Sequence, residues 1–120
     1  MNVKMSSTSI VFKISEDELH TLKQHAAITQ NVPLGTHTLK LKVKTVLQEE
    51  AVTIHFDWID DSACALVLCV TSAQIQTLCQ MGKSREGICV LRRDTEVFLQ
   101  VDVRRDSRPI EPTFSDYNLL

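Results

Sequence analysis

The chain has 120 residues, enough for one domain whose core needs neither a metal nor a disulfide in order to fold. A net charge of −2 and a pI near 6.0 argue against a protein built around nucleic-acid phosphates, so we do not expect nucleic acid as a partner. No segment approaches the roughly 18 apolar residues of a membrane span. The first ten residues lack the apolar core of a secretion signal, which predicts a cytoplasmic protein.

The first regular elements are expected after a polar, frayed segment at residues 1–8. The alternation in Ser9–Ile14 predicts a strand. Ser15 can then cap a helix, and Glu18, three residues later, completes a capping box. We expect this helix to bury a stripe made of Leu19, Leu22 and Ala26, and to have ended before Pro33.

The next predicted strand, Thr38–Val46, has one apolar and one basic face. Its apolar residues alternate with Lys40, Lys42 and Lys44, which predicts a sheet with one side in water. We interpret the lysines as protection of an edge strand against aggregation. The alternative is an anion-binding strip.

The second part of the chain repeats this kind of pattern. Apolar residues at every second position predict a strand with one buried face at Val52–Trp58, and Ala63–Val70 is apolar on both faces, as in a central strand. Thr71 with Gln74 forms a second capping box, followed by an inner helix face. That face comprises Ile75, Leu78, Cys79 and Gly82, and Gly82 also ends the helix. Strands at Gly87–Leu91 and Glu96–Arg104 complete the series, the second with Val97, Leu99, Val101 and Val103 inward.

The two strand–helix segments can be aligned. Val11–His25 and Val67–Met81 are 56 residues apart and share four identical positions of fifteen. These patterns predict a single α+β domain of two strand–helix–strand–strand halves, residues 9–46 and 51–104, followed by a tail at 105–120. About six strands would form one sheet or a small barrel with two helices, the halves being related by a pseudo-twofold duplication.

The sequence contains no recognisable catalytic frame. His20, His25, His37 and His55 lie in four different settings, and three glycines cannot form a phosphate-binding loop. The four cysteines lack the spacing of a zinc site and are expected to be reduced. We therefore expect no catalytic residue, no cofactor and no metal.

Two features near the end of the chain are candidates for binding. Arg104, Arg105 and Arg108 could grip a carboxylate or phosphate, or could pair with the neighbouring acids and anchor the tail. The tail contains Phe114 and Tyr117 among its apolar residues, so it either folds back on its own domain or docks on another chain. These five residues are the candidate binding residues.

A family resemblance rests on landmarks between residues 9 and 106. The opening SIVFKISEDEL, with Ser9, Ile10, Ile14, Ser15, Glu18 and Leu19, and the closing FLQVDVRRD, with Leu99, Val101 and Asp102, resemble a family of small uncharacterised bacterial proteins known as a domain of unknown function. The resemblance implies a bacterial, cytoplasmic setting and assigns no activity. In topology alone, the predicted halves are also similar to sliding-clamp domains, a remote alternative.

The function predicted from these observations is a small non-enzymatic module that binds a protein partner or its own copy. The competing prediction is a small-ligand or anion-binding domain, or a modest enzyme, with a site between the two halves near Arg104 or His55. An apolar pocket with convergent polar groups would favour the ligand. An exposed apolar patch would favour a protein partner.

Overall fold

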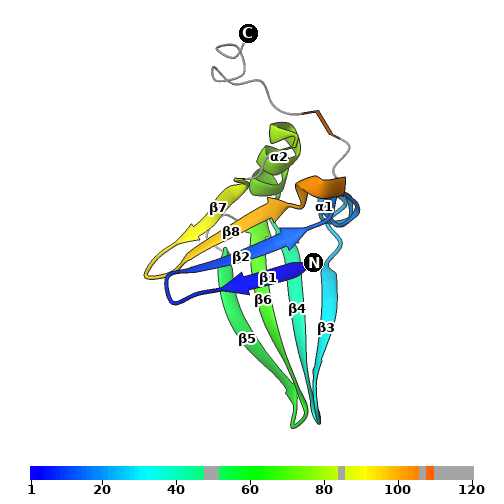
Figure 1. Ribbon diagram of the computed structural model, residues 1–120, viewed down its shortest axis with the longest axis vertical. Helices are drawn as coiled ribbons and strands as arrows, with labels where there is room; N and C mark the ends of the chain where they lie inside the picture. The colour runs from blue at the N-terminus through cyan, green and yellow to red at the C-terminus, as the bar shows by residue number, and fades with distance from the viewer. Residues whose placement is uncertain (48–51, 84–85, 106–107, 110–120) are drawn as a thin grey trace.

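A computed structural model describes residues 1–47, 52–83, 86–105 and 108–109. These residues form an α+β fold of two four-stranded sheets and two α-helices (Figure 1). The short sheet has the order β1 (Asn2–Met5), β2 (Ser9–Ile14), β8 (Glu96–Val101), β7 (Ile88–Arg92). The long sheet has the order β3 (Ile28–Leu34), β4 (His37–Val46), β6 (Ala63–Thr71), β5 (Thr53–Asp60). The prediction of about six strands in one sheet or a barrel is therefore wrong.

Two strands were not expected from the sequence. β1 pairs antiparallel with β2, so the prediction that residues 1–8 are frayed is wrong. β3 combines a polar stretch, residues 29–31, and Pro33 with apolar residues, and it pairs antiparallel with β4. Pro33 is tolerated because β3 is an edge strand, where a missing N–H breaks no ladder on the open side.

Each sheet is assembled from both halves of the chain. The parallel pair β2–β8 joins them in the short sheet, and the parallel pair β4–β6 joins them in the long sheet. Both halves have the order strand, strand, helix, strand, strand, instead of the predicted strand, helix, strand, strand. Exchanging the halves strand for strand converts the pairing pattern of one sheet into that of the other.

Both helices begin at the predicted capping boxes. Ser15 Oγ accepts a hydrogen bond from the Glu18 backbone N–H (3.0 Å) at the start of α1 (Glu16–Lys23), and Thr71 Oγ1 accepts one from Gln74 (3.0 Å) at the start of α2 (Ser72–Met81). α1 ends earlier than its apolar stripe suggested. His25 has a positive φ of 63° and Ala26 is exposed, so the prediction that Ala26 faces inward is wrong.

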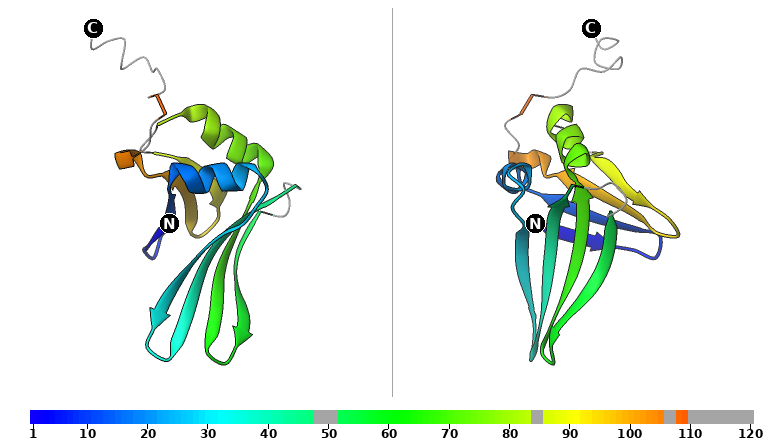
Figure 2. Two further views of the ribbon diagram at one scale, coloured as in Figure 1. Left: turned by 90° about the vertical axis from the view of Figure 1, so that its right-hand side faces the viewer. Right: turned by 180° about the vertical axis from the view of Figure 1, so that it is seen from behind.

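The core lies between the two sheets and continues under the helices (Figure 2). Phe12 and Leu99 come from the short sheet, Leu68 from the long sheet, and Leu22 and Leu78 from the helices, and all five side chains are buried. Val103 does not extend the last strand as predicted. It begins a 3₁₀ turn, Val103–Arg105, and is half-buried.

The lysine-bearing strand is not an edge. β4 lies between β3 and β6, so the interpretation of Lys40, Lys42 and Lys44 as edge protection is wrong. On the outer face of the long sheet these lysines pair in register with Ala65, Val67 and Cys69 of β6. Those three small side chains are buried in a cluster drawn from β6 and β4. The aliphatic stems of half-buried lysines suit the role of covering such neighbours.

Candidate functional site

The long sheet extends well beyond the short sheet that covers it (Figures 1 and 2). β4 and β6 have ten and nine residues, whereas the strands of the short sheet have four to six. The core-facing side of the long sheet therefore loses its cover toward the β3–β4 and β5–β6 turns. At that end it presents a group of apolar residues that we call the distal patch: Leu34, Leu39, Phe56, Trp58 and Cys64.

Burial along this face falls from one cross-strand row to the next. Leu68, in the row under the short sheet, is fully buried. One row further, Leu66 is 3 % exposed but its β5 neighbour Phe56 is 59 % exposed. In the last row Cys64 is half-buried and Trp58 is 82 % exposed. The alternation of apolar residues that forms the core thus continues along the strands into a part of the sheet that is exposed to solvent.

The distal patch surrounds a shallow cavity of about 280 Å³ with an acidic rim. The rim includes Asp60 and Asp61 of the β5–β6 turn. Asp60 Oδ1 accepts hydrogen bonds from the backbone N–H and the hydroxyl of Ser62, at 2.8 and 2.9 Å. The bond from the Ser62 backbone is the main reason that the pKa of Asp60 lies below its ordinary value. Asp60 therefore stays anionic at neutral pH.

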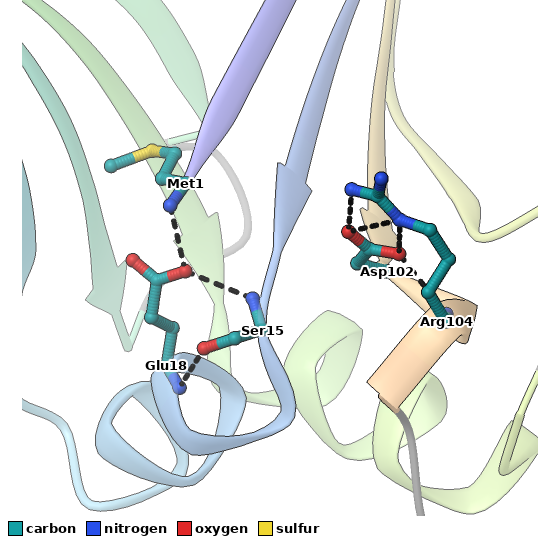
Figure 3. Close-up of polar contacts among 5 residues, drawn as sticks. All are labelled: Met1, Ser15, Glu18, Asp102 and Arg104. Atoms are coloured by element: carbon teal, nitrogen blue, oxygen red, sulfur yellow. Dashed lines mark hydrogen bonds and ion pairs between the residues drawn. The ribbon is translucent and has the colours of Figure 1, made fainter.

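Three of the predicted binding residues lie elsewhere, near the last turn of the described chain. Arg104 grips Asp102 in a fork, with Nη2 to Oδ2 at 2.6 Å and Nε to both carboxylate oxygens (Figure 3). Arg108 Nη1 donates to the carbonyls of Leu78 and Cys79, at 3.1 and 3.4 Å. Arg105 ends the 3₁₀ turn. The structure thus places Arg104 and Arg108 in contacts within the chain.

The other two predicted residues, Phe114 and Tyr117, lie outside the described residues. Of the local pairing that the sequence suggested, the Asp102–Arg104 pair is present (Figure 3). The side-chain hydrogen bond from Arg104 holds the pKa of the Asp102 carboxyl well below its usual range. An arginine so engaged has less capacity to recognise an external anion.

A second cavity of about 340 Å³ lies between the two helices, where the halves of the chain meet. Its lining includes Leu22, His25, Ser72, Ile75 and Cys79. Ser72 Oγ and His25 Nδ1 are 3.5 Å apart, at the limit of a hydrogen bond. Neither Arg104 nor His55 belongs to the lining of this cavity. Arg104 lines a different cavity of about 530 Å³, together with Asp102 and with Ser15, Glu16 and Asp17 from the first half of the chain.

Within the described segments, no group of three or more His, Cys, Asp or Glu side chains is arranged to hold a metal ion. Cys69 is buried and the other three thiols are half-buried, and all four are free. Among the helices of the described residues, none is both long and apolar enough to cross a membrane.

Comparisons of the chain with protein-family models, with curated proteins and with solved structures found no match.

The distal patch was missed by reasoning from the sequence. Ile54, Phe56 and Trp58 were assigned to one buried face because they alternate, and they do share a face. Alternation identifies the face but not how far a second sheet covers it. The predicted strand lengths gave no such signal, because Glu96–Arg104, which belongs to the short sheet, was predicted to be as long as Thr38–Val46 of the long sheet.

Proposed function

We propose that the protein is a small non-enzymatic module that binds a protein partner, and that the distal patch is its docking surface. The observation that carries the proposal is the exposure of Phe56 and Trp58 on β5 and of Leu34 on the opposite edge strand, around one cavity at one end of the long sheet. Large contiguous apolar patches with polar rims mark interaction surfaces in soluble proteins. Tryptophan is among the residue types that most often dominate binding energy when it becomes buried in an interface.

None of the described elements covers the distal patch, and this favours a protein partner over a small ligand. The cavity over it has a volume of about 280 Å³, below the roughly 300–1,000 Å³ of the clefts in which proteins bury drug-sized ligands. A flat apolar surface with an acidic edge suits a protein surface with apolar residues at its centre.

Photo-crosslinking tests this function directly. A benzoylphenylalanine in place of Trp58 keeps an aromatic group on the patch and should form one specific protein adduct in cells that produce the chain. The same probe in a Phe56→Lys background should lose that adduct, and in an Asn31→Lys background, on the opposite edge strand, should keep it. Absence of any adduct, or an adduct that survives Phe56→Lys, would rule the function out.

A ligand site remains the second candidate, favoured by the cavity between the helices. It combines an apolar floor from Leu22 and Ile75 with polar groups from His25 and Ser72. A ligand there would stabilise the folded chain in proportion to its concentration. Thermal-shift screening with Gln76→Trp, which adds a large side chain to the cavity lining from an exposed position, as the control separates this candidate from patch binding.

We also infer that the two halves descend from one duplicated unit. Support comes from the shared element order, the exchangeable pairing pattern and the offset of 56 residues, which relates β2 and α1 to β6 and α2. Such an origin would account for two sheets that are each assembled from both halves.

A further inference from the structure

The edges of the two sheets differ in how they are protected. Edge strands present unpaired N–H and C=O groups, and proteins block them with short strands, lysine, proline or irregularities. β1 has four residues and contains Lys4, β7 has an irregularity between Cys89 and Leu91, and β3 contains Pro33. β5 has eight residues, none of which is Lys, Arg or Pro, and its irregularity is confined to the last residues. Of the four edges of the described sheets, β5 is the one open to strand addition.

We infer that β5 pairs antiparallel with β5 of a second copy of the chain, so that two long sheets join into one of eight strands. This inference rests on the proposed function and names its partner. Antiparallel pairing of a strand with itself creates a twofold axis, and such an interface closes on two copies instead of propagating. In the dimer the backbone groups of the β5 edge are paired, so this edge is no longer open to strand addition.

The side chains of β5 select one register. When the axis passes through Phe56, residues 54–58 face the same residues of the second copy in reverse order, and His55 lies opposite Asp57. When the axis passes through Asp57, two carboxylates face each other, which is unfavourable. Within one chain His55 Nε2 already lies 3.3 Å from Asp57 Oδ1, so both groups are on the outer face and within reach of the seam.

The inner face of the same register is apolar. Phe56 faces Phe56 of the second copy, and Ile54 faces Trp58. Aromatic and aromatic–aliphatic cross-strand pairs stabilise a sheet beyond simple burial. Phe56 and Trp58 of both copies would lose exposed apolar surface at the seam, which contributes to the ~1,200 Å² at the lower end of stable interfaces. Backbone hydrogen bonds along the seam and the flanking side chains add to this area.

Trp58 is the only tryptophan in the chain, so its fluorescence reports directly on the proposed seam. We expect sedimentation to show a dimer that dissociates on dilution. The emission of Trp58 should shift to longer wavelength over the same concentration range, because the ring is 82 % exposed in the single chain. A chain that stays monomeric, with solvated Trp58 emission at all concentrations, would overturn the inference.

Charge exchange tests the register. His55→Asp places a carboxylate opposite Asp57, and Asp57→Lys removes the acceptor that faces the His55 imidazole, so each should weaken dimerisation by about tenfold or more because the contact occurs twice per dimer. The double variant H55D/D57K restores opposite charges and should return dimerisation to within about threefold of the parent. Equal weakening in the double variant would overturn the proposed register. Asn31→Lys, an added charge on the β3 edge, is the matched control and should leave dimerisation unchanged.

The crosslinking experiment separates the two levels of the proposal. An adduct with the mass of two chains supports self-pairing. An adduct with a different protein alone overturns self-pairing and leaves the proposed function standing, whereas no adduct overturns both.

Discussion

Individual polar residues in this protein mostly hold the chain in place. Arg104 is itself exposed, yet its guanidinium fixes Asp102 immediately after β8, and the Asp102 backbone N–H donates to Ile14 across the short sheet at 2.8 Å. Glu18 similarly accepts from the Ser15 N–H (2.9 Å) and lies 3.0 Å from the Met1 amino group, so one carboxylate joins β1, β2 and α1 (Figure 3). The sequence indicated the Asp102–Arg104 pair but not the Met1 contact, because nothing in the pattern predicted β1.

The Asp102–Arg104 pair should make stability depend on pH in acid. The folded pKa of Asp102 is lowered chiefly by the side-chain hydrogen bond from Arg104, so the carboxylate contributes stability above its unfolded pKa of about 4 and loses it as pH falls below that value. Asp102→Asn should therefore be less stable than the parent at pH 7, and the difference should shrink between about pH 4 and pH 2. Urea unfolding across this pH range measures the difference in the free energy of unfolding, with Asp61→Asn as a control for the loss of one surface charge. A difference that is constant with pH would contradict the assignment.

Elements that begin with a strong local signal were predictable, and those that depend on a neighbour were not. Both capping boxes specify a helix start within four residues, and both were found from the sequence. β3 lacks such a signal, because most of its residues are exposed and only pairing with β4 defines it. The helix caps also differ in surroundings: Thr71 is 4 % exposed, whereas Ser15 is open to solvent.

Thr71→Ala should destabilise the protein more than Ser15→Ala. Loss of a helix cap costs about 0.5–2 kcal/mol, and we expect Thr71→Ala near the upper limit and Ser15→Ala near the lower. The reason is that Gln74, the partner of Thr71, also donates to the Val90 carbonyl at 2.9 Å and so connects α2 to β7. Urea unfolding gives both values. Thr77→Ala, which removes an exposed hydroxyl bonded to the Ala73 carbonyl, should be nearly neutral. Equal costs at the two caps would contradict this account.

At the scale of the whole molecule, the α+β class and the element types of six strands and two helices followed from periodicity. The division into two sheets did not, because it depends on which strands pair across the halves, and alternation says nothing about partners. For the same reason, the distal patch was not predicted. Clustered arginines are visible in a sequence, whereas an apolar face without a cover becomes visible only once the sheets are placed.

Removal of the tail distinguishes the two ways in which copies could associate. A chain that ends after Pro109 keeps the Arg108 contacts with the end of α2, and its dimerisation through β5 should be unchanged in light scattering. A chain that ends after Arg105 should in addition lose about 1 kcal/mol of stability to urea, because the carbonyls at the end of α2 lose their donor. Dissociation to monomers on removal of residues 110–120 would show that the tail, not β5, joins the copies.

The two parallel strand pairs have a consequence for how this chain can be divided. β2 needs β8, and β4 needs β6, so a polypeptide cut between β4 and β5 yields two fragments that each carry two hairpins without their central neighbours. Neither fragment could bury its apolar strands unaided. Mixed together, the two should reassemble, and either one alone would have to find a substitute for the missing half in another molecule of itself.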